Sequence, residues 1–192
     1  MISFIIPAHN SEKFLKRCVE SVVKEEKQSK DNNLAEVIII ENGSSDHTKQ
    51  IGTALAEKYE NVFLICSEKG VSNARNAGVK AAHGEWIFFL DADDYLPAGT
   101  LQKLLDTVNS GKAADLYIFS YEKGNAIVNV ATGENAYGYE GTGVRECLAG
   151  MLRNPTRCMA VWGKLFRHSI IQQSSLDFNK KLSLAEDSDF LI

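Results

Sequence analysis

Residues 86–94 read WIFFLDADD, a wholly apolar run joined to a cluster of acids. Trp86–Leu90 is apolar at every position, which predicts a strand buried on both faces, as in the centre of a parallel sheet. Asp91, Asp93 and Asp94 follow at once, and carboxylates this close repel one another unless a cation lies among them. We therefore expect the strand end to offer oxygen ligands to Mg²⁺ or Mn²⁺. The alternative at this point is a solvated turn whose aspartate caps the next helix.

Similar apolar runs recur on both sides of this stretch and alternate with amphipathic segments. Phe14, Cys18 and Val22, for example, recur every four residues, which is the spacing of one helix face. This alternation predicts the α/β class, with a mostly parallel sheet covered by helices on both faces. The predicted strands are 2–6, 37–40, 62–66, 86–90 and 116–121. The first predicted helix begins at an Asn10-Ser11 cap and is followed by a polar loop at 24–33. The other predicted helices lie around 51–59, at 71–82 and around 101–108.

The pattern changes beyond residue 123. We expect a hairpin strand at 126–130, a loop at 132–143 and a further helix around 144–151. Near the end, Ser183 to Glu186 fits a capping box, which starts a helix. The chain then stops at the apolar Ile192 without a C-cap signal. We interpret residues 1–192 as a single domain truncated at its C-terminus, with a naturally frayed end as the alternative.

The composition argues against several classes of protein. The chain has 192 residues, 44% of them hydrophobic, which is typical of one domain with a sizeable core. Its net charge of −4 is unfavourable for nucleic-acid binding, so we expect no nucleic-acid partner. No apolar run approaches the roughly 20 residues of a membrane span, and without signal-peptide features the cytoplasm is the expected compartment. The four cysteines form no CxxC pair, and glycine-rich dinucleotide and P-loop motifs are absent from the sequence.

Polar residues come after each of the first four predicted strands. They are residues 7–10, 41–46, 67–70 and 91–94. Ligands of open parallel sheets bind at the carboxyl ends of the strands, so we expect these segments to share one site. Arg75, among small residues, can reach a phosphate there or form a surface ion pair. His9, just after the first strand, is either a ligand contact or a structural histidine.

A second group of carboxylates lies near the C-terminus, at Glu186, Asp187 and Asp189. Glu186 occupies the capping-box position, whereas the two aspartates point elsewhere. A carboxylate beside a metal-bound donor can take the proton of an acceptor hydroxyl, which is general-base catalysis. A polar helix start is the alternative.

Five stretches together resemble one family, the inverting family 2 glycosyltransferases of the GT-A fold. They occur in family order over nearly the whole chain and read FIIPAHNSEKFLKRCVESV, EVIIIENGSSDHT, GVSNARNAGVKAAHGEWIFFLDADD, WGKLFR and AEDSDF. The resemblance implies a Rossmann-like three-layer sandwich with a mostly parallel central sheet. It also implies transfer of a sugar from a nucleotide diphosphate sugar, a UDP-sugar by expectation, to an acceptor hydroxyl with inversion.

The resemblance implies roles for individual residues. Asp91 and Asp93 match the DxD motif around Ala92, with Asp93 as the main metal ligand and Asp91 at the ribose or a metal-bound water. Asp187 matches the catalytic base of the ED motif. The other implied contacts are Pro7, Ala8 and His9 at the first wall of the nucleotide pocket, Glu41 and Asn42 at the base, Arg75 near the nucleotide or its diphosphate, and Trp162 and Lys164 on the acceptor side. His9 and Asn42 stand where a tyrosine and a second aspartate are more usual.

The implied cofactor is Mn²⁺ or Mg²⁺, which neutralises the leaving diphosphate. The implied partners are the nucleotide diphosphate sugar and a glycan or lipid-linked acceptor in cell-surface polysaccharide synthesis. The expected location is cytoplasmic, at the inner face of the plasma membrane, with peripheral membrane association through a region beyond residue 192. The alternative function is a catalytically silent domain that binds a nucleotide sugar or a partner.

Overall fold

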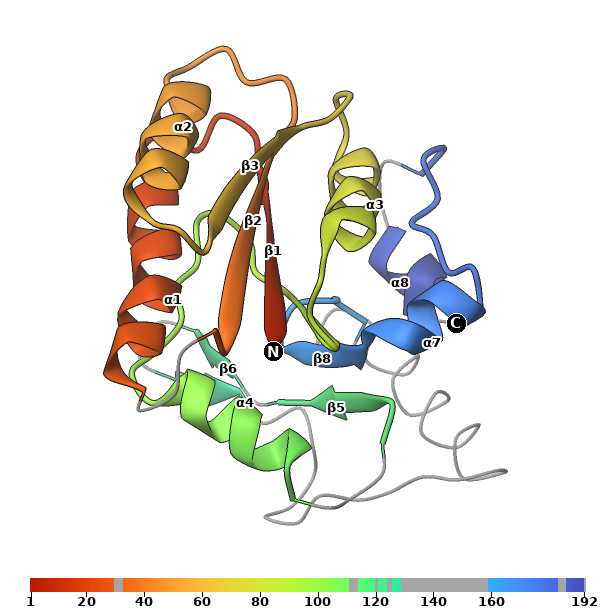
Figure 1. The fold of residues 1–192 in the computed structure, drawn as a ribbon. Coiled ribbons are helices and arrows are strands. Elements are labelled where there is room, and N and C mark those ends of the chain that lie inside the picture. The colour runs from red at the N-terminus through yellow and green to blue at the C-terminus, as the bar shows by residue number, and fades with distance from the viewer. Residues whose placement is uncertain are drawn as a thin grey trace.

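Six strands form one sheet in the order β3-β2-β1-β4-β8-β5 (Figure 1). The computed structural model describes residues 1–29, 33–110, 114–119, 121–123, 126–128, 159–182 and 186–191. The sheet strands are β1 Ile2–Ala8, β2 Ala35–Glu41, β3 Val62–Cys66, β4 Trp86–Phe89, β5 Leu116–Ile118 and β8 Lys164–Arg167. Only β8 runs against the others, because it pairs antiparallel with both β4 and β5, so the mostly parallel sheet is confirmed.

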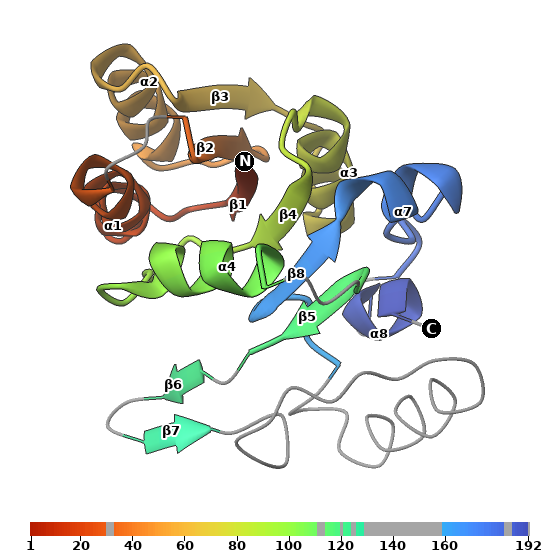
Figure 2. The ribbon, with the colours of Figure 1, turned by 60° about the horizontal axis from the view of Figure 1, so that its bottom comes forward.

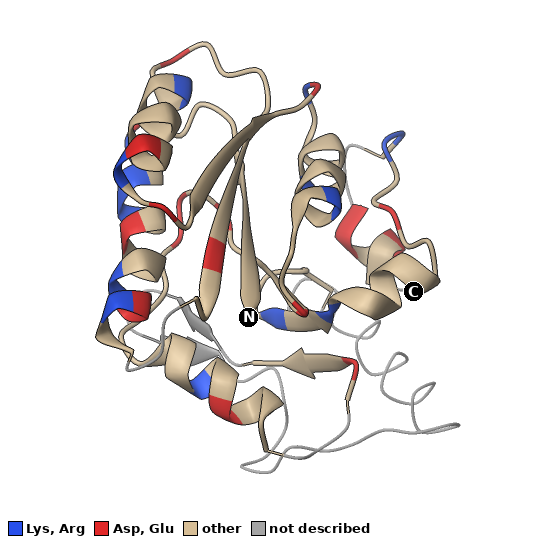
Figure 3. Ribbon diagram, in the orientation of Figure 1, with Lys and Arg blue, Asp and Glu red and all other residues tan. Residues whose placement is uncertain are grey.

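Helices cover both faces of the sheet and give three layers (Figure 2). The helices are α1 Leu15–Gln28, α2 Thr48–Lys58, α3 Val71–Ala81, α4 Thr100–Val108, α7 His168–Gln173 and α8 Glu186–Leu191. Side chains alternate between the faces of a strand, so Phe4 joins the core under α1, α2 and α4, while Ile5 joins the core under α3, α7 and α8. Along α1 and α2, acidic and basic residues are interspersed on the outer side (Figure 3). The predicted three-layer α/β fold is confirmed.

β1 lies between β2 and β4 and runs parallel to both. The chain passes from β1 outward to β2 and β3, then returns through α3 to β4 on the other side of β1. Such a reversal of strand order opens a crevice at the carboxyl ends of the strands. α3 lies close to the sheet here: a Cβ atom on Gly78 would collide with the side chain of Ile5, so this approach requires glycine.

Several predicted boundaries were wrong. α1 continues to Gln28 through the first part of the predicted polar loop, where Glu25 buries its side chain although its neighbours in sequence are polar. The same helix begins at Leu15 rather than at Asn10-Ser11, since the Ser11 carbonyl accepts the Phe14 and Leu15 amides in a turn before it. The predicted strand 116–121 is divided between β5, which ends at Ile118, and a separate hairpin.

In the described part of the C-terminal third lies a strand that the sequence patterns did not predict. β8 is only four residues long, yet it lies between β4 and β5 with Leu165 fully buried. The hairpin of β6 (Tyr121–Lys123) with β7 (Ala126–Val128) agrees with the predicted strand at 126–130 over the described residues. The predicted loop at 132–143, the helix at 144–151 and the capping residue Ser183 lie outside the described residues. Within the described part of the chain, no helix combines the length and the apolar character needed to cross a membrane.

Candidate active site

An open pocket of about 340 Å³ lies at the carboxyl ends of β1, β2 and β4. Of the nine residues predicted to contact a nucleotide sugar, six line it: Pro7, His9, Asn42, Asp91, Ala92 and Asp93. Asn10 also lines it and lies in the segment 7–10 that was expected at the site, whereas Ser11, Phe14 and Val71 were not predicted. Ser11 and Phe14 lie between β1 and α1, and Val71 begins α3 just after the loop that follows β3. Their place in the sequence could have identified them, because a switch-point ligand binds where these strands end. The structure therefore gathers most of the predicted contacts into one concave surface.

Ala8 and Glu41 lie behind the lining of this pocket. Ala8 is fully buried, and its carbonyl accepts the Asn42 amide at 3.1 Å. Glu41 is 6% exposed, and its Oε1 accepts the Ser44 amide at 2.6 Å. Both residues shape the loop after β2 in this structure, and their contact with a base stays a prediction.

The acidic loop at residues 91–94 is held against α1. Arg17 Nη2 donates to the Asp93 carbonyl at 2.6 Å, and Cys18 Sγ donates to the Asp91 carbonyl at 3.5 Å. These bonds use main-chain oxygens of the loop rather than its carboxylates. Arg17, whose guanidinium also lies 5.1 Å from the Tyr95 ring centre, was not predicted as part of the site.

Two carboxyl groups of this loop, those of Asp91 and Asp94, have raised pKa values. Burial raises the pKa of Asp91 to about 6, against the lowering effect of Arg75 and with further raising by neighbouring aspartates. Burial and the nearby Asp93 also raise the pKa of Asp94. A bound cation would favour the ionised forms. Among the described residues no cluster of three or more His, Cys, Asp or Glu side chains is placed to hold a metal, so a cation here would need oxygens from a ligand as well.

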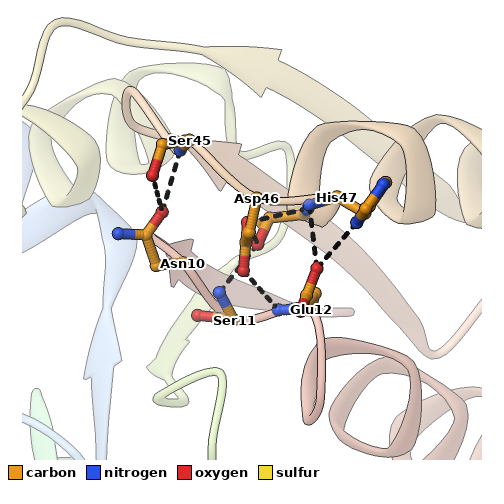
Figure 4. A network of polar contacts seen from close by, with 7 residues as sticks. Asn10, Ser11, Glu12, Ser45, Asp46 and His47 are labelled. Carbon is orange, nitrogen blue, oxygen red and sulfur yellow. Dashed lines mark hydrogen bonds and ion pairs between the residues drawn. The ribbon is translucent and has the colours of Figure 1, made fainter.

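A hydrogen-bond network joins the loops after β1 and β2 (Figure 4). Asp46 accepts the Glu12 amide at 3.1 Å through Oδ2, and the Thr48 amide and hydroxyl at 3.0 and 2.5 Å through Oδ1. Glu12 Oε2 in turn accepts the His47 amide at 3.1 Å. Asn10 Oδ1 accepts the Ser45 amide at 2.9 Å. We call these six residues the loop latch, and it fixes the wall of the pocket that carries His9 and Asn42.

Arg75 is 4% exposed and meets three carboxylates. Its Nη1 donates to Asp187 Oδ1 at 2.5 Å and to Glu186 Oε1 at 3.1 Å, and its Nη2 lies 3.6 Å from Asp91 Oδ1. The acidic first turn of α8 therefore lies beside α3 (Figures 1 and 3). The predicted phosphate-reaching arginine thus connects the acidic loop after β4 to the predicted base.

Asp187 is held on its other side by the segment before β8. Its Oδ2 accepts the Val161 amide at 3.1 Å. Burial raises the pKa of Asp187, while Arg75, the Val161 amide and Lys164 lower it by favouring the charged form. A carboxylate with a raised pKa is a stronger base when ionised.

Trp162 and Lys164, the predicted acceptor-side residues, lie in this same segment. Trp162 directly follows Val161, and Lys164 is 2% exposed with its ammonium donating to the Ala160 carbonyl. Lys164 therefore holds the chain next to Asp187. Whether either residue contacts an acceptor stays a prediction.

Comparison with known proteins identifies relatives over most of the chain. The family model described as "Glycosyl transferase family 2" matches residues 3–172. The uncharacterized glycosyltransferase EpsJ of Bacillus subtilis is 27% identical over 99% of this chain and 54% of EpsJ. The poly(ribitol-phosphate) beta-glucosyltransferase of Bacillus spizizenii is 28% identical over 98% of this chain and 28% of that protein. The chain spans about half the length of EpsJ, and less of the second relative.

Solved structures of two proteins show the same fold. Residues 1–349 of TarS from S. aureus superpose with a TM-score of 0.78 at 23% identity, over 98% of this chain and 53% of that one. TarS has also been solved with UDP-GlcNAc, with a TM-score of 0.72 to this chain. Glucosyl-3-phosphoglycerate synthase from Mycobacterium tuberculosis, in complex with Mn²⁺, UDP and glucosyl-3-phosphoglycerate, gives a TM-score of 0.62 at 18% identity, over 100% and 63% of the two chains.

Proposed function

The chain belongs to glycosyl transferase family 2, and we propose that it transfers a sugar from a UDP-sugar to an acceptor hydroxyl with inversion at the anomeric carbon. One observation carries this proposal: Arg75 joins the acidic loop of the pocket to Asp187 on α8. The proposed leaving-group site and the proposed base, two parts that a single displacement needs, would therefore adjoin each other at one edge of the sheet.

We propose that Asp93 and Asp91 hold Mn²⁺ or Mg²⁺ together with the donor. The fit rests on their carboxylate oxygens, which hard cations prefer, and on the closeness of Asp91, Asp93 and Asp94, whose mutual repulsion a cation would relieve. The mycobacterial synthase with Mn²⁺ and UDP supports the same choice of ion. The chemistry that such an ion would supply, held by Asp91 and Asp93, is neutralisation of the charge that develops on the leaving diphosphate.

Asp187 is the proposed general base. It takes the proton of the acceptor hydroxyl while that oxygen bonds to the anomeric carbon and the bond from this carbon to the diphosphate breaks. Attack from the face opposite the leaving group inverts the configuration. Burial helps because it raises the pKa of Asp187, and the Val161 amide orients the carboxylate.

The donor nucleotide is proposed from the pocket wall and from the relatives. His9 and Asn42 line the pocket beside the latched loops, and the amide oxygen of an asparagine can accept the N3–H of uracil. TarS was solved with UDP and with UDP-GlcNAc, which supports a uridine donor.

The acceptor is proposed to be a glycan or a lipid-linked glycan in cell-surface polysaccharide synthesis. The poly(ribitol-phosphate) beta-glucosyltransferase among the relatives supports a cell-surface polymer. Trp162 and Lys164, beside Asp187, are the proposed acceptor-side residues. A lipid-linked acceptor places the protein in the cytoplasm at the inner face of the plasma membrane.

A donor screen with an Asp187→Asn variant tests the activity. Release of UDP, GDP or TDP is measured for the wild-type protein with a panel of sugar donors and glycan acceptors. Asp187→Asn should lower transfer by roughly 10²–10⁴-fold, the usual contribution of a general base, with donor affinity nearly unchanged. Glu186→Gln is the matched control on the same helix turn.

The alternative, a catalytically silent binding domain, makes a different forecast. It predicts UDP binding without release of nucleotide from any donor. Full activity of Asp187→Asn would move the base to another carboxylate, such as Asp189.

Calorimetry tests the proposed metal. UDP should bind more tightly in Mn²⁺ than in chelator, and Asp93→Asn should remove that difference while the protein stays folded, because Asp93 is exposed at a strand end rather than in the core. Asp177→Asn, an equal change of charge on an exposed loop, should retain the full effect of Mn²⁺. Equal UDP affinities with and without Mn²⁺ in the wild-type protein would refute the metal role.

A further inference from the structure

One face of α3 holds the C-terminal segments of the described chain. Asn76 Nδ2 donates to the Phe178 carbonyl at 2.9 Å, and Asn76 Oδ1 accepts the Phe178 amide at 2.8 Å. Ser72, one turn earlier, donates to the Asn179 carbonyl at 3.2 Å. Arg75 lies between these two residues on the same helix and reaches α8 itself.

The guanidinium of Arg75 is part of a stack that ends on α8. It lies 5.3 Å from the ring centre of Phe178, and that ring stacks on Phe190 of α8 at 4.1 Å with an interplanar angle of 1°. Arg75 therefore contacts α8 directly at Asp187 and Glu186. It is also linked to α8 through the ring of Phe178, which stacks on Phe190.

α8 is held by these contacts and by the ring of Phe190, which also packs on Phe89 and Phe166. It is six residues long, and a helix this short is marginal without tertiary support. Among its described residues only Phe190 is buried. Asp187 has one oxygen on Arg75 and the other on the Val161 amide, so its carboxylate is fixed from two sides.

The burial of Arg75 is unfavourable in one respect. Its Nε is buried and has no hydrogen-bond partner among the described residues, which costs free energy. Stability alone gives no reason for that arrangement. Its Nη1, by contrast, donates to two carboxylates of α8, and its Nη2 forms an ion pair with Asp91 at 3.6 Å.

We infer that Arg75 is a positioning residue, which fixes the carboxylate of Asp187 between α3 and the segment before β8 and ties it to the donor loop through Asp91. The inference rests on the proposed function for the role of Asp187 as base. It assigns Arg75 to the placement of that base rather than to direct binding of the nucleotide. The placement itself is measurable without any substrate.

Amide hydrogen exchange of the full chain tests the placement. The Val161 amide donates to Asp187, so its protection reports whether that carboxylate is in place. In Arg75→Met the protection of Val161 and of residues 186–191 should fall about tenfold or more, since one strong hydrogen-bonded contact is lost. In Arg75→Lys the protection of the same amides should fall less, because lysine keeps the positive charge. Amides of β1 and β2 in the same sample show whether each variant is folded.

Arg167→Met is the matched control. Arg167 also pairs with two carboxylates, Glu85 at 2.9 Å and Asp115 at 3.0 Å, and lies 4.5 Å from the ring centre of Trp86. It has the same kinds of partners as Arg75 but lies at the other end of the strands. Its loss should leave Val161 protection at the wild-type level. Unchanged protection in Arg75→Met would overturn the inference.

Kinetics separate a positioning residue from a donor ligand. Arg75→Met should lower kcat by about 10²-fold, the usual effect of a base displaced by about 1 Å, with little change in donor KM. Added guanidinium should restore part of kcat. A raised donor KM with unchanged kcat would overturn the inference and make Arg75 a donor ligand. If the wild-type chain turns over no donor, the proposed function fails, and the exchange of Val161 still decides the placement.

Discussion

Asn42 is the residue whose substitution most directly tests the nucleotide pocket. It lines the pocket at the end of β2 and is 4% exposed. A carboxylate accepts a hydrogen bond more strongly than an amide. Asn42→Asp should therefore increase the preference for UDP over other nucleotides by about fivefold, since a charged acceptor adds roughly 1 kcal/mol. Competition binding with a panel of nucleoside diphosphates measures the ratio.

Asn109→Asp is the control for this change of charge. Asn109 is exposed at the end of α4, away from the pocket lining. The same nucleotide panel should show no change for this variant. If Asn42→Asp behaves like Asn109→Asp, residue 42 does not read the base.

At the scale of elements, the loop latch decides how firmly the wall of the pocket is held. Asp46 is its centre, because it accepts hydrogen bonds from Glu12 and from the first residue of α2. Asp46→Ala should lower the free energy of unfolding, because the Glu12 amide and the Thr48 amide and hydroxyl lose their acceptor. UDP affinity should fall as well, since the loops after β1 and β2 lose their connection. Urea denaturation and calorimetry measure the two effects.

Asp106→Ala separates the latch from a general loss of a surface carboxylate. Asp106 is exposed on α4, where its Oδ1 accepts a hydrogen bond from Gln102 at 2.8 Å. Its removal should change stability by only about 0.2–0.5 kcal/mol, as for other pairs one helix turn apart, and leave UDP affinity alone. Equal effects of the two substitutions would show that the latch has no special role.

At the scale of the whole molecule, Glu36 joins three strands at the end of the sheet opposite the pocket. Glu36 Oε1 accepts hydrogen bonds from the Ser3 hydroxyl at 2.5 Å and from the His83 and Gly84 amides at 2.6 and 3.1 Å. Burial by itself would raise the pKa of Glu36, but these hydrogen bonds outweigh it and hold the pKa below its ordinary value of 4.5. Ser3 lies on β1, Glu36 on β2, and Gly84 just before β4.

This pKa predicts the pH dependence of stability. A carboxyl whose pKa is lowered by folding stabilises the protein above its unfolded pKa, and the stabilisation is lost as pH falls through the folded pKa. Glu36→Gln should cost about 1.5–3 kcal/mol at pH 7, the usual loss for hydrogen bonds to a charged group. The difference from wild type should shrink below pH 4.5. Urea unfolding at several pH values measures it.

Glu57→Gln, an exposed change on α2, is the control and should leave the pH dependence of unfolding as in the wild type. A Glu36→Gln difference that is constant from pH 7 to acid would contradict the role given to the ionised carboxylate.

The sequence by itself determined the α/β class, the first four strands and most of the pocket lining. The burial of an apolar run such as Trp86–Leu90 can be predicted from the run itself, because all the residues that indicate it are adjacent in sequence. The rule for parallel strands then places the loop after each run at one edge of the sheet. Pro7, His9, Asn42 and Asp93 could therefore be predicted to meet without knowing any contact.

Only the tertiary structure decided how the pocket is connected to Asp187. Arg75 and Asp187 are 112 positions apart, and no local spacing relates them. The sequence patterns did not predict β8 for a related reason. Its four residues are too few to show a hydrophobic period, and it is buried because β4 and β5 lie on either side of it. Periodicity reports which face of an element is buried, whereas the choice of partner depends on the packing of elements distant in sequence.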